Sequence, residues 1–447
     1  MCTLCASLSP SDQAISLADQ HVAPASAPVS APGSLPNYSL AQIADQLTHG
    51  FWEWSGASWR AFDLGPGRTL SIDLFDLSQA ERFIARAALA AWTDATGIRF
   101  TEVATTSEGP TDAAANRNTA EKVAVGGVFY GDIATDRDTD WIAVNLVAGK
   151  TYTFTLLSAQ IDDVFDPKLA LRNSAGTVLA SNDDVSWNDY NSELTFTAAT
   201  GGTYYLQANS ALPGGSGEYR IAVSRAGETR TGAHITFRND IEDAAWAVSD
   251  VLGNDIQFSL VNIGRDFSDD PLSLDAYWLE TYIHEVGHAL GLGHAGNYNG
   301  SADWSEDASY RQDSVLFSVM SYFFTNAGDP EMVNPYYRGS WGTVATVMAA
   351  DLIAIQNLYG KGAPVRAGDT TYGANSNLGG YLGQLFGAIF DGDDVSPAVW
   401  NGGNMIMTIH DSGGFDVIDL STISVAQTIN LGQNVLYFDA AFFFSLM

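Results

Sequence analysis

Residues 281 to 297, TYIHEVGHALGLGHAGN, hold three histidines whose spacing dictates the local fold. His284 and His288 are four residues apart, so a helix presents both imidazoles on one face to a single metal ion. His294 follows six residues later, and a continuing helix would turn it about 240° away from His288. The chain must therefore leave the helix at Gly291, because glycine accepts a positive φ there.

Three histidine ligands leave one position of a tetrahedral zinc ion open to water, as in catalytic zinc sites. Glu285 lies next to the ligand face of the helix and can serve as a general base. The alternative is that two of the imidazoles are only buried, hydrogen-bonded groups of an apolar helix. The five fixed positions, Gly291 and His294 among them, argue against that alternative.

The pattern H-E-x-x-H-x-x-G-x-x-H is the signature of the metzincin metallopeptidases, and it also predicts a methionine turn downstream. Residues 318 to 322, SVMSY, supply that turn, and the span from Tyr298 to it resembles the serralysin branch of the metzincins. The resemblance implies that Met320 lies beneath the zinc ligands. The implied ligands of the zinc ion are His284, His288, His294 and, as a displaceable fourth, Tyr322.

By the same resemblance, the catalytic residues of a secreted endopeptidase are Glu285 and Tyr322. Zinc lowers the pKa of a bound water from about 15.7 towards about 7. Glu285 would accept the proton and pass it to the leaving amine, while Tyr322 would steady the oxyanion. For Tyr322 the alternative is ordinary packing. The rival function is a catalytically inactive, calcium-dependent binding or adhesion protein on this scaffold, but the complete ligand set with Glu285 argues against it.

The expected fold class is α+β, a metzincin catalytic domain with a mixed sheet and an active-site helix. Ser78 and Glu81 form a capping box that predicts a helix ending near Gly97, between strands at 68–74 and 98–103. The segments LAAWTDATGIRFTEV, AHITF and TVMAADLIAIQNLYG resemble serralysins. We assign residues 37–108 and 229–360 to this discontinuous domain.

Residues 109–228 interrupt that domain with short alternating runs of hydrophobic and polar residues, separated by turns. This pattern is typical of an antiparallel β-sandwich, and the segment resembles the bacterial pre-peptidase C-terminal domain. It could bind a substrate protein or a surface polymer, or it could be a solubilising spacer. The aspartates that could bind calcium in the first case are Asp132, Asp136, Asp138, Asp140, Asp183 and Asp184.

Residues 361–447 resemble the start of the serralysin C-terminal calcium-binding β-roll, through VRAGDTTYGANSN and IHDSGGFDVIDLS. Calcium takes six to eight oxygen ligands, and a glycine- and aspartate-rich turn without calcium is the alternative. The tandem nonapeptide repeats of a full roll are absent, so we expect a truncated chain or a minimal roll. The implied calcium ligands are Arg366, Gly368, Thr370, Asp411, Gly413 and Asp416.

Residues 1–36 are rich in alanine, proline and serine and predict a disordered leader or propeptide. They include both cysteines, Cys2 and Cys5, and a thiolate could hold the zinc in a zymogen. The favoured alternative is an incidental pair. The sequence shows neither an N-terminal signal peptide nor a membrane span, so we expect extracellular localisation through the type I secretion machinery, as in the family resembled.

The balance of charges excludes partners that are polyanions. Lys plus Arg number 20 against 52 Asp plus Glu, which gives a net charge of −32. Nucleic acids and anionic lipids are bound by Lys and Arg, so neither is an expected partner. We expect a monomer that acts on protein or peptide substrates.

Overall fold

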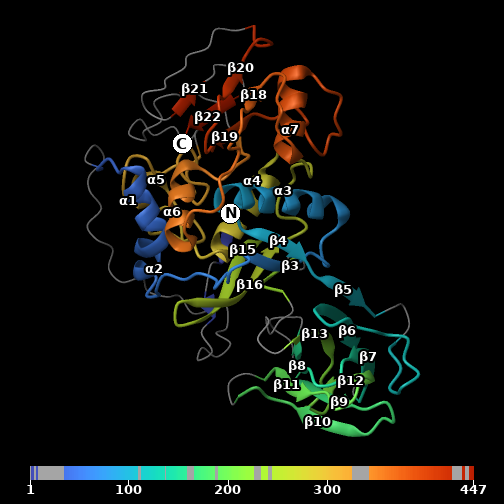
Figure 1. The fold of residues 1–447 in the computed structure, drawn as a ribbon. Coiled ribbons are helices and arrows are strands. Elements are labelled where there is room, and N and C mark those ends of the chain that lie inside the picture. Colours follow the sequence, from blue (N-terminus) through green and yellow to red (C-terminus); the bar gives the residue numbers. More distant parts are fainter. Residues whose placement is uncertain are drawn as a thin grey trace.

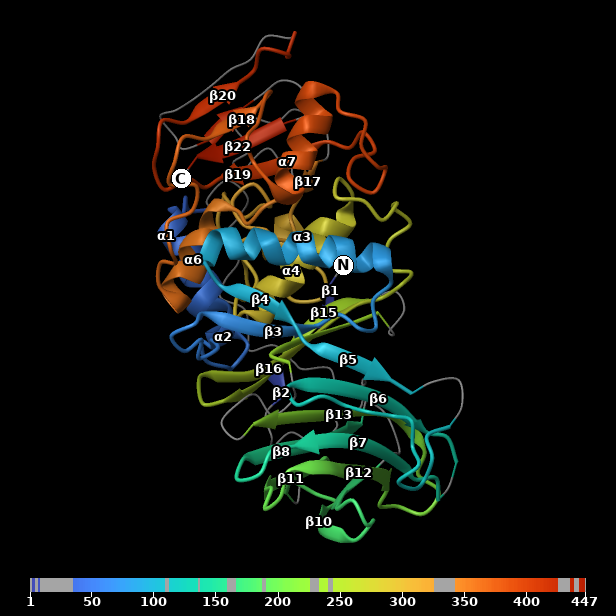
Figure 2. The ribbon, with the colours of Figure 1, turned by 45° about the vertical axis from the view of Figure 1, so that its right-hand side comes forward.

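A computed structural model of the 447-residue chain places the predicted elements in three neighbouring parts. In Figures 1 and 2 the β-sandwich, the helices around the mixed sheet and the C-terminal region follow one another along the molecule. The structure describes residues 2–4, 7–8, 35–108, 112–135, 137–158, 166–186, 190–225, 233–239, 244–324, 342–424, 435–437 and 442–446.

Helix α3 (Gln79–Thr96) begins and ends where the sequence predicts. The Ser78 hydroxyl accepts the Glu81 N–H at 3.3 Å, and a carboxylate oxygen of Glu81 accepts the Ser78 N–H at 2.6 Å. The helix ends at Gly97, whose φ of 68° is left-handed. A Cβ there would lie 3.1 Å from the Cα of Gly362, so this turn also lets the C-terminal region approach closely.

A mixed sheet lies under α3 and positions the histidine-bearing helix. Its strands run in the order β1-β15-β16-β14-β3-β4, with β2 also paired to β15. Strands β3, β4, β14 and β16 are mutually parallel, and β15 is antiparallel to β16. The strands are β3 (Thr69–Asp73), β4 (Arg99–Glu102), β14 (Ile235–Arg238), β15 (Ala245–Leu252) and β16 (Asp255–Ile263).

Two short strands of the leader complete this sheet, β1 (Cys2–Leu4) and β2 (Ser7–Leu8). Both pair in parallel with β15 through their main chains. The composition of the leader gives no sign of them. Apart from these strands and residues 35 and 36, the leader lies outside the described residues. For that part, the disorder of residues 1–36 stays a prediction.

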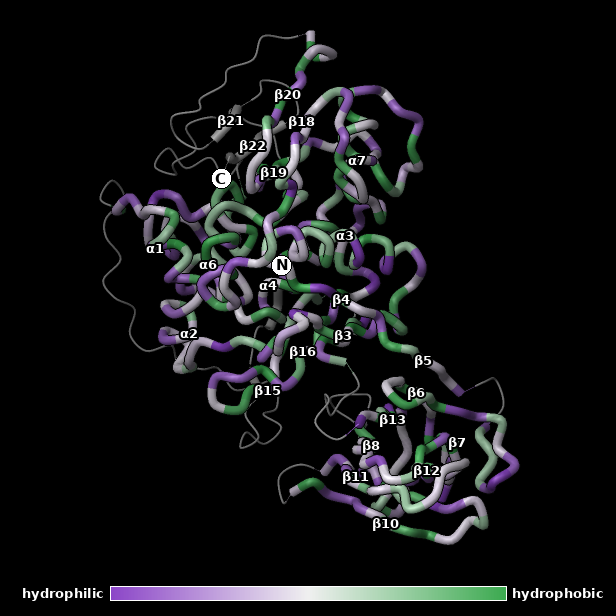
Figure 3. Tube along the Cα trace, viewed as in Figure 1, coloured by the Kyte–Doolittle hydropathy of each residue, from purple (hydrophilic) through white to green (hydrophobic). Residues whose placement is uncertain are grey.

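The inserted segment folds as a sandwich of two antiparallel sheets, ordered β10-β9-β12-β7 and β11-β8-β13-β6, with β5 joining β6 in parallel. Its hydrophobic core is separate from that of the rest of the chain, and hydropathy alternates along its strands (Figure 3). The strands are β5 (Ala104–Ser107), β6 (Gly127–Ile133), β7 (Asp140–Leu146), β8 (Thr151–Ser158), β9 (Pro167–Arg172), β10 (Val178–Asn182), β11 (Ser192–Thr197), β12 (Gly202–Ser210) and β13 (Gly217–Arg225).

The C-terminal region shares one hydrophobic core with the part of the chain around the mixed sheet, since Met407 and Phe386 belong to the same buried cluster as Trp92. Two small sheets form here, ordered β17-β19-β22-β21 and β18-β20. The elements are β17 (Thr343–Val344), β18 (Thr371–Gly373), α7 (Gly380–Phe386), π-helix η2 (Gly387–Asp391), β19 (Met405–Ile409), β20 (Val417–Asp419), β21 (Val435–Tyr437) and β22 (Phe442–Leu446).

The remaining helices are α4, which carries His284 and His288, and five others (Figure 1). Within the described ranges, none is long and apolar enough to cross a membrane. They are α1 (Leu40–Asp45), π-helix η1 (Gln46–Gly50), α2 (Phe51–Trp54), α4 (Tyr277–Ala289), α5 (Trp304–Asp307) and α6 (Ala349–Tyr359).

Trp92 on α3 is the largest side chain buried against α4. It is fully buried, and its indole N–H donates to the Ile283 carbonyl at 2.9 Å. Trp92→Ala should lower the free energy of unfolding by about 3–5 kcal/mol, because it removes a large core side chain and leaves a cavity. Trp59→Ala, at an indole 43% exposed, is the control and should cost about 1 kcal/mol or less. Urea denaturation of both variants measures the difference, and equal losses would contradict the prediction.

Candidate metal centre

Helix α4 presents His284 and His288 and then stops, as the spacing of the histidines requires. Its last residue is Ala289, and Gly291 follows with a φ of 102°. A Cβ at Gly291 would lie 2.2 Å from the Arg60 carbonyl oxygen, so only glycine fits this turn. The chain then doubles back towards the helix.

The three predicted ligand histidines come together in the structure. The Nε2 atom of His288 lies 3.0 Å from that of His284 and 3.0 Å from that of His294. All three side chains are buried. Three nitrogens on one tetrahedral zinc ion, at about 2.0–2.1 Å each, would lie about 3.3 Å apart, so the observed cluster fits zinc closely.

Hydrogen bonds on the far side of two of the rings fix their tautomers. The Nδ1 atom of His284 lies 2.8 Å from the Val319 carbonyl oxygen, and that of His288 lies 2.8 Å from the Leu292 carbonyl oxygen. A carbonyl can only accept, so each Nδ1 carries the proton. The Nε2 lone pairs therefore face one another, an arrangement that a bound cation stabilises.

Burial keeps these imidazoles neutral. It lowers the pKa of His284 to about 4 and the pKa values of His288 and His294 well below the usual range. Near neutral pH a metal ion can thus bind all three imidazoles without first displacing a proton from an imidazolium ring. A histidine nitrogen that binds a metal ion must be unprotonated, so the burial that keeps these rings neutral favours metal binding.

The N-terminal helices hold the loop that carries His294. The Trp52 indole N–H donates to the Gly291 carbonyl at 2.9 Å, and the Leu47 carbonyl accepts the Gly293 N–H at 2.7 Å. The Phe51 ring meets the His294 ring edge-on, with centroids 5.0 Å apart. The sequence shows these aromatic residues as a group but gives no sign that they touch the third histidine.

Met320 lies beneath helix α4, where the sequence resemblance places it. A Cβ at Gly287 would lie 2.6 Å from the Met320 sulfur, so a glycine between the two helical histidines makes room for this side chain. The Met320 carbonyl accepts the Ala295 N–H at 3.1 Å. The methionine turn therefore contacts both the helix and the loop that supply the ligands.

Asp351 on α6 holds the methionine turn, and sequence reasoning missed it. Its carboxylate accepts the Val319 N–H at 2.8 Å, the Met348 N–H at 3.0 Å and the Ser318 hydroxyl at 2.5 Å. Val319 is also the residue whose carbonyl orients His284. Asp351 is thus linked to a candidate ligand through two successive hydrogen bonds.

Tyr322 lies beside the histidines, and its hydroxyl contacts the loop at Gly300. Its ring centroid is 4.5 Å from that of His294. The hydroxyl oxygen accepts the Gly300 N–H at 3.3 Å. Glu285, the proposed base, is fully buried on α4 between the two helical histidines.

The predicted calcium residues lie on two neighbouring segments, joined by the parallel pairing of β18 with β20. The Asp416 carboxylate accepts the Thr370 N–H at 3.0 Å. The two oxygens of Asp411 accept the Tyr372 hydroxyl at 2.7 Å and the Gly413 N–H at 3.0 Å. The Gly368 carbonyl accepts the Thr370 hydroxyl at 3.1 Å.

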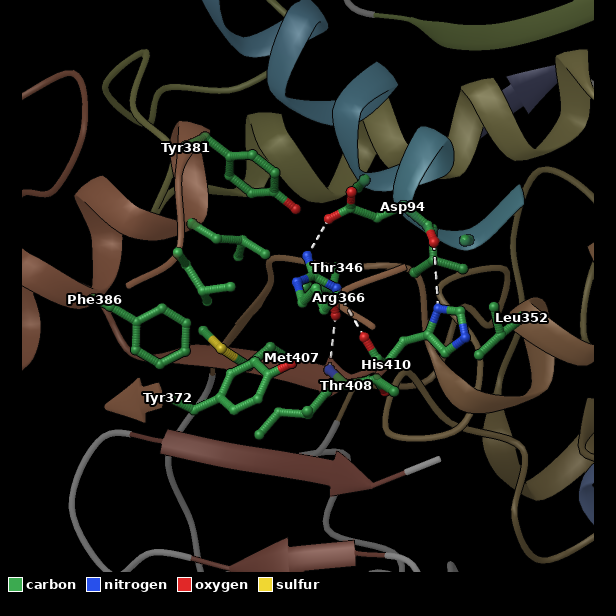
Figure 4. A pocket seen from close by; sticks show the side chains of 16 residues that line it. Asp94, Thr346, Leu352, Arg366, Tyr372, Tyr381, Phe386, Met407, Thr408 and His410 are labelled. Atoms are coloured by element: carbon green, nitrogen blue, oxygen red, sulfur yellow. Dashed lines mark hydrogen bonds and ion pairs between the residues drawn. The ribbon is translucent and has the colours of Figure 1, made fainter. Parts of the chain in front are cut away.

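The Arg366 side chain serves a separate contact, at a cavity between α3 and the C-terminal region (Figure 4). It forms an ion pair with Asp94 and donates to the His410 carbonyl at 2.8 Å. The cavity, of about 30 Å³, has room for one or two waters, and none of the three clustered histidines lines it. The ion pair of Arg366 with Asp94 fastens the C-terminal region to α3.

The structure describes only some of the remaining residues that the sequence analysis singled out, the aspartates of the sandwich and the two cysteines. Asp138 and Asp140 lie near each other at the start of β7, whereas Asp183 pairs with Lys168 at 3.5 Å. Asp136 and Cys5 lie outside the described residues. For Cys2 the structure describes the main chain alone, so the thiolate hypothesis stays a prediction.

Comparison with known proteins confirms the two sequence resemblances. Residues 138–210 match the family model of the bacterial pre-peptidase C-terminal domain. The chain is 38% identical to serralysin C of Dickeya chrysanthemi over 161 residues, 36% identical to the metallopeptidase AprA of Pseudomonas marginalis over 163, and 32% identical to a serralysin of Photorhabdus luminescens over 174.

These matches cover 36%, 36% and 38% of this chain, and 29%, 31% and 32% of the relatives' lengths. The chain thus spans about a third of the relatives it matches. Among solved structures, the pre-peptidase C-terminal domain of a collagenase from Bacillus anthracis is 17% identical, with a TM-score of 0.19. That similarity covers 26% of this chain and 98% of the collagenase domain.

Glu280 lies one helical turn before His284 and gives the stability of this centre a pH dependence. Burial raises its pKa to about 8, although the Val344 N–H donates to it at 2.8 Å. The folded state thus retains a proton that the unfolded chain releases above about pH 4.5, so this group lowers stability as the pH rises from about 4.5 to 8. Glu280→Gln should flatten that part of the profile of melting temperature against pH.

The matched control is Glu306→Gln, at an exposed carboxylate on α5. Its profile should run parallel to that of the wild type. If the profile of Glu280→Gln also ran parallel to that of the wild type, Glu280 would not be the group that retains a proton in the folded state.

Proposed function

We propose that this chain is a secreted zinc-dependent endopeptidase with a metzincin catalytic domain, which hydrolyses peptide bonds of extracellular proteins. The observation that supports the proposal best is that the Nε2 atom of His288 lies 3.0 Å from those of His284 and His294, while the Nδ1 atoms of His284 and His288 lie beside carbonyl oxygens. The serralysin relatives supply the reaction class. Buried, neutral imidazoles with converging lone pairs suit a metal ion better than a purely structural role.

The residues that would hold the zinc ion are His284, His288 and His294. When bound, zinc supplies a Lewis acid that polarises a substrate carbonyl and makes water a stronger acid. Glu285 would take the proton from the attacking water and later hand it to the departing amine. Its complete burial excludes bulk water from that proton transfer.

Tyr322 would donate its hydroxyl proton to the oxyanion that forms on the substrate, or act as a fourth ligand before substrate enters. The hydroxyl oxygen accepts the Gly300 N–H at 3.3 Å, and a hydroxyl that accepts one hydrogen bond can still donate its own proton. That distance is long for a hydrogen bond to a hydroxyl oxygen, so binding of a metal ion to this oxygen would give up little by losing it. Met320 would support the ligand helix from below.

The proposal extends to the rest of the chain. Residues 37–108 and 229–360 would form the catalytic domain, 109–228 the inserted sandwich and 361–447 a partial calcium-binding β-roll. Residues 1–36 would be a propeptide, and export would use a type I pathway. The oxygens proposed for calcium in the roll come from Arg366, Gly368, Thr370, Asp411, Gly413 and Asp416.

Glu285→Gln tests the general base. The variant should retain zinc, because the three imidazoles are unchanged, and should lose roughly 10²–10⁴-fold of its activity on casein. Glu53→Gln, at an exposed residue of α2, is the control and should match the wild type. Activity of Glu285→Gln near the wild-type level would refute the role of Glu285. A wild type that binds zinc and cleaves no casein would instead support the inactive binding protein.

His288→Ala tests the ligand set. This histidine is the one that lies 3.0 Å from both of the others, so its loss should remove zinc as well as chelator-sensitive activity. His49→Ala, at a half-exposed ring outside the cluster, should keep both. Zinc content is measured by metal analysis of the purified proteins. Full zinc occupancy in folded His288→Ala would overturn the assignment.

A further inference from the structure

We propose that Asp313, a buried aspartate between α5 and the methionine turn, is a positioning residue for Tyr322. It would hold the main chain around Tyr322 through two hydroxyl groups, those of Tyr298 and Ser321. It would thereby set where the Tyr322 ring lies beside the histidines, without itself touching the substrate. The inference rests on the proposed function, in which Tyr322 steadies the oxyanion.

Asp313 receives two hydroxyl groups on a single carboxylate oxygen. Its Oδ1 atom accepts the Tyr298 hydroxyl at 2.9 Å and the Ser321 hydroxyl at 2.7 Å. All three side chains are buried. Hydrogen bonds to a carboxylate are stronger than those between neutral groups, so both hydroxyl groups are oriented firmly. Asp313 thus joins the loop that follows His294 to the methionine turn.

Both hydroxyl groups in turn hold main-chain groups at Tyr322. The Tyr298 hydroxyl oxygen accepts the Tyr322 N–H at 3.4 Å, and the Ser321 hydroxyl oxygen accepts the Phe323 N–H at 3.1 Å. The second bond is the shorter and therefore the stronger of the two. A hydroxyl that donates its proton to Asp313 keeps its lone pairs for such donors. The main chain is thus held at Tyr322 and at the next residue.

The Tyr298 ring carries the network to the third histidine. Its centroid lies 5.0 Å from that of the Tyr322 ring and 5.8 Å from that of the His294 ring. The Tyr322 and His294 rings are themselves 4.5 Å apart. These distances are typical of packed aromatic pairs. Tyr298, fixed by Asp313, is therefore one of the surfaces against which the Tyr322 ring lies.

The segment that carries Asp313 is fastened to the same loop. The Tyr310 hydroxyl donates to the Ala295 carbonyl at 2.7 Å, and the Tyr310 carbonyl accepts the Asp313 N–H at 3.4 Å. A Cβ at Gly296 would lie 2.8 Å from the Oδ2 atom of Asp313, so a glycine two residues after His294 leaves room for this carboxylate. The position of Asp313 is therefore well determined relative to the histidine loop.

Stability alone does not account for an aspartate here. The Oδ2 atom of Asp313 is buried and accepts no hydrogen bond from the residues that the structure describes. Burial raises the pKa of Asp313 to about 7, although the hydroxyls of Ser321 and Tyr298 lower it. A buried carboxylate with one unpaired oxygen destabilises the folded state, and such local costs are typical of functional sites.

Steady-state kinetics of Asp313→Ala test the proposal. With zinc fully bound, this variant should have a kcat on a peptide substrate lower by about tenfold or more, because Tyr322 is misplaced in the transition state. Its KM should change by less than about twofold. Asp313→Asn keeps an acceptor oxygen in the place of Oδ1 and should recover most of the kcat. The matched control is Asp140→Ala, which removes the buried acceptor of the Tyr219 hydroxyl in the sandwich and should keep the wild-type kcat.

A double-mutant cycle shows whether Asp313 acts through Tyr322. Tyr322→Phe removes the hydroxyl that the proposed mechanism uses, so adding Asp313→Ala to it should lower kcat by less than about a further twofold. An equal loss in both backgrounds would overturn the proposal, because Asp313 would then act on another group. Loss of zinc from folded Asp313→Ala would overturn it too, since Asp313 would then support the ligands.

Fluorine NMR of the protein labelled with 3-fluorotyrosine observes the Tyr322 ring without relying on activity. The Tyr322 resonance is the one that Tyr322→Phe lacks. It should shift or broaden in Asp313→Ala and stay in place in Asp140→Ala, and an unchanged resonance in folded Asp313→Ala refutes the positioning role. A wild type that cleaves no peptide contradicts the proposed function instead, and the resonance still decides whether Asp313 positions Tyr322.

Tyr298→Phe provides the same test if Asp313→Ala does not fold. It keeps the ring and removes only the hydroxyl between Asp313 and the Tyr322 N–H, so it should move the Tyr322 resonance and lower kcat. Tyr219→Phe removes a buried tyrosine hydroxyl of the sandwich and should do neither. A wild-type kcat together with a wild-type Tyr322 resonance in Tyr298→Phe would overturn the proposal.

Discussion

The approach of the His284 and His294 imidazoles to that of His288, with Nε2 atoms 3.0 Å apart in each pair, is the constraint on which the candidate metal centre depends. Two of the rings are aimed by carbonyl oxygens, from Val319 and from Leu292. Neither carbonyl belongs to the helix, so the helix alone cannot form the site. The turn at Gly291 and the methionine turn must both be held in place before the nitrogens can converge.

Each turn is held by residues far away in the sequence. Asp351 holds the Val319 N–H, and thereby the carbonyl that orients His284. Trp52 holds the carbonyl of Gly291. A catalytic metal tolerates small errors in ligand placement poorly, so these supports matter as much as the ligands do. These supports come from α2 and from α6, which are far apart in the sequence.

The sequence predicts the features that local spacing encodes. The histidines and the capped helix that ends at Gly97 follow from periodicities within one segment. Asp351 and Phe51 could not be found in this way, because each meets its partners only after distant segments have packed. A single acidic or aromatic residue has no spacing that distinguishes a support from an ordinary surface or core residue.

The position of the inserted sandwich has a geometric reason. Strand β3 is paired on one side with β4, after which the chain leaves the sheet, and on the other side with β14, where it returns. The insertion therefore begins and ends on either side of strand β3. The mixed sheet can form around that strand without the two ends of the insertion being moved apart. Because the sandwich has its own core, it can fold without disturbing that sheet, provided the short connection after β5 is firm.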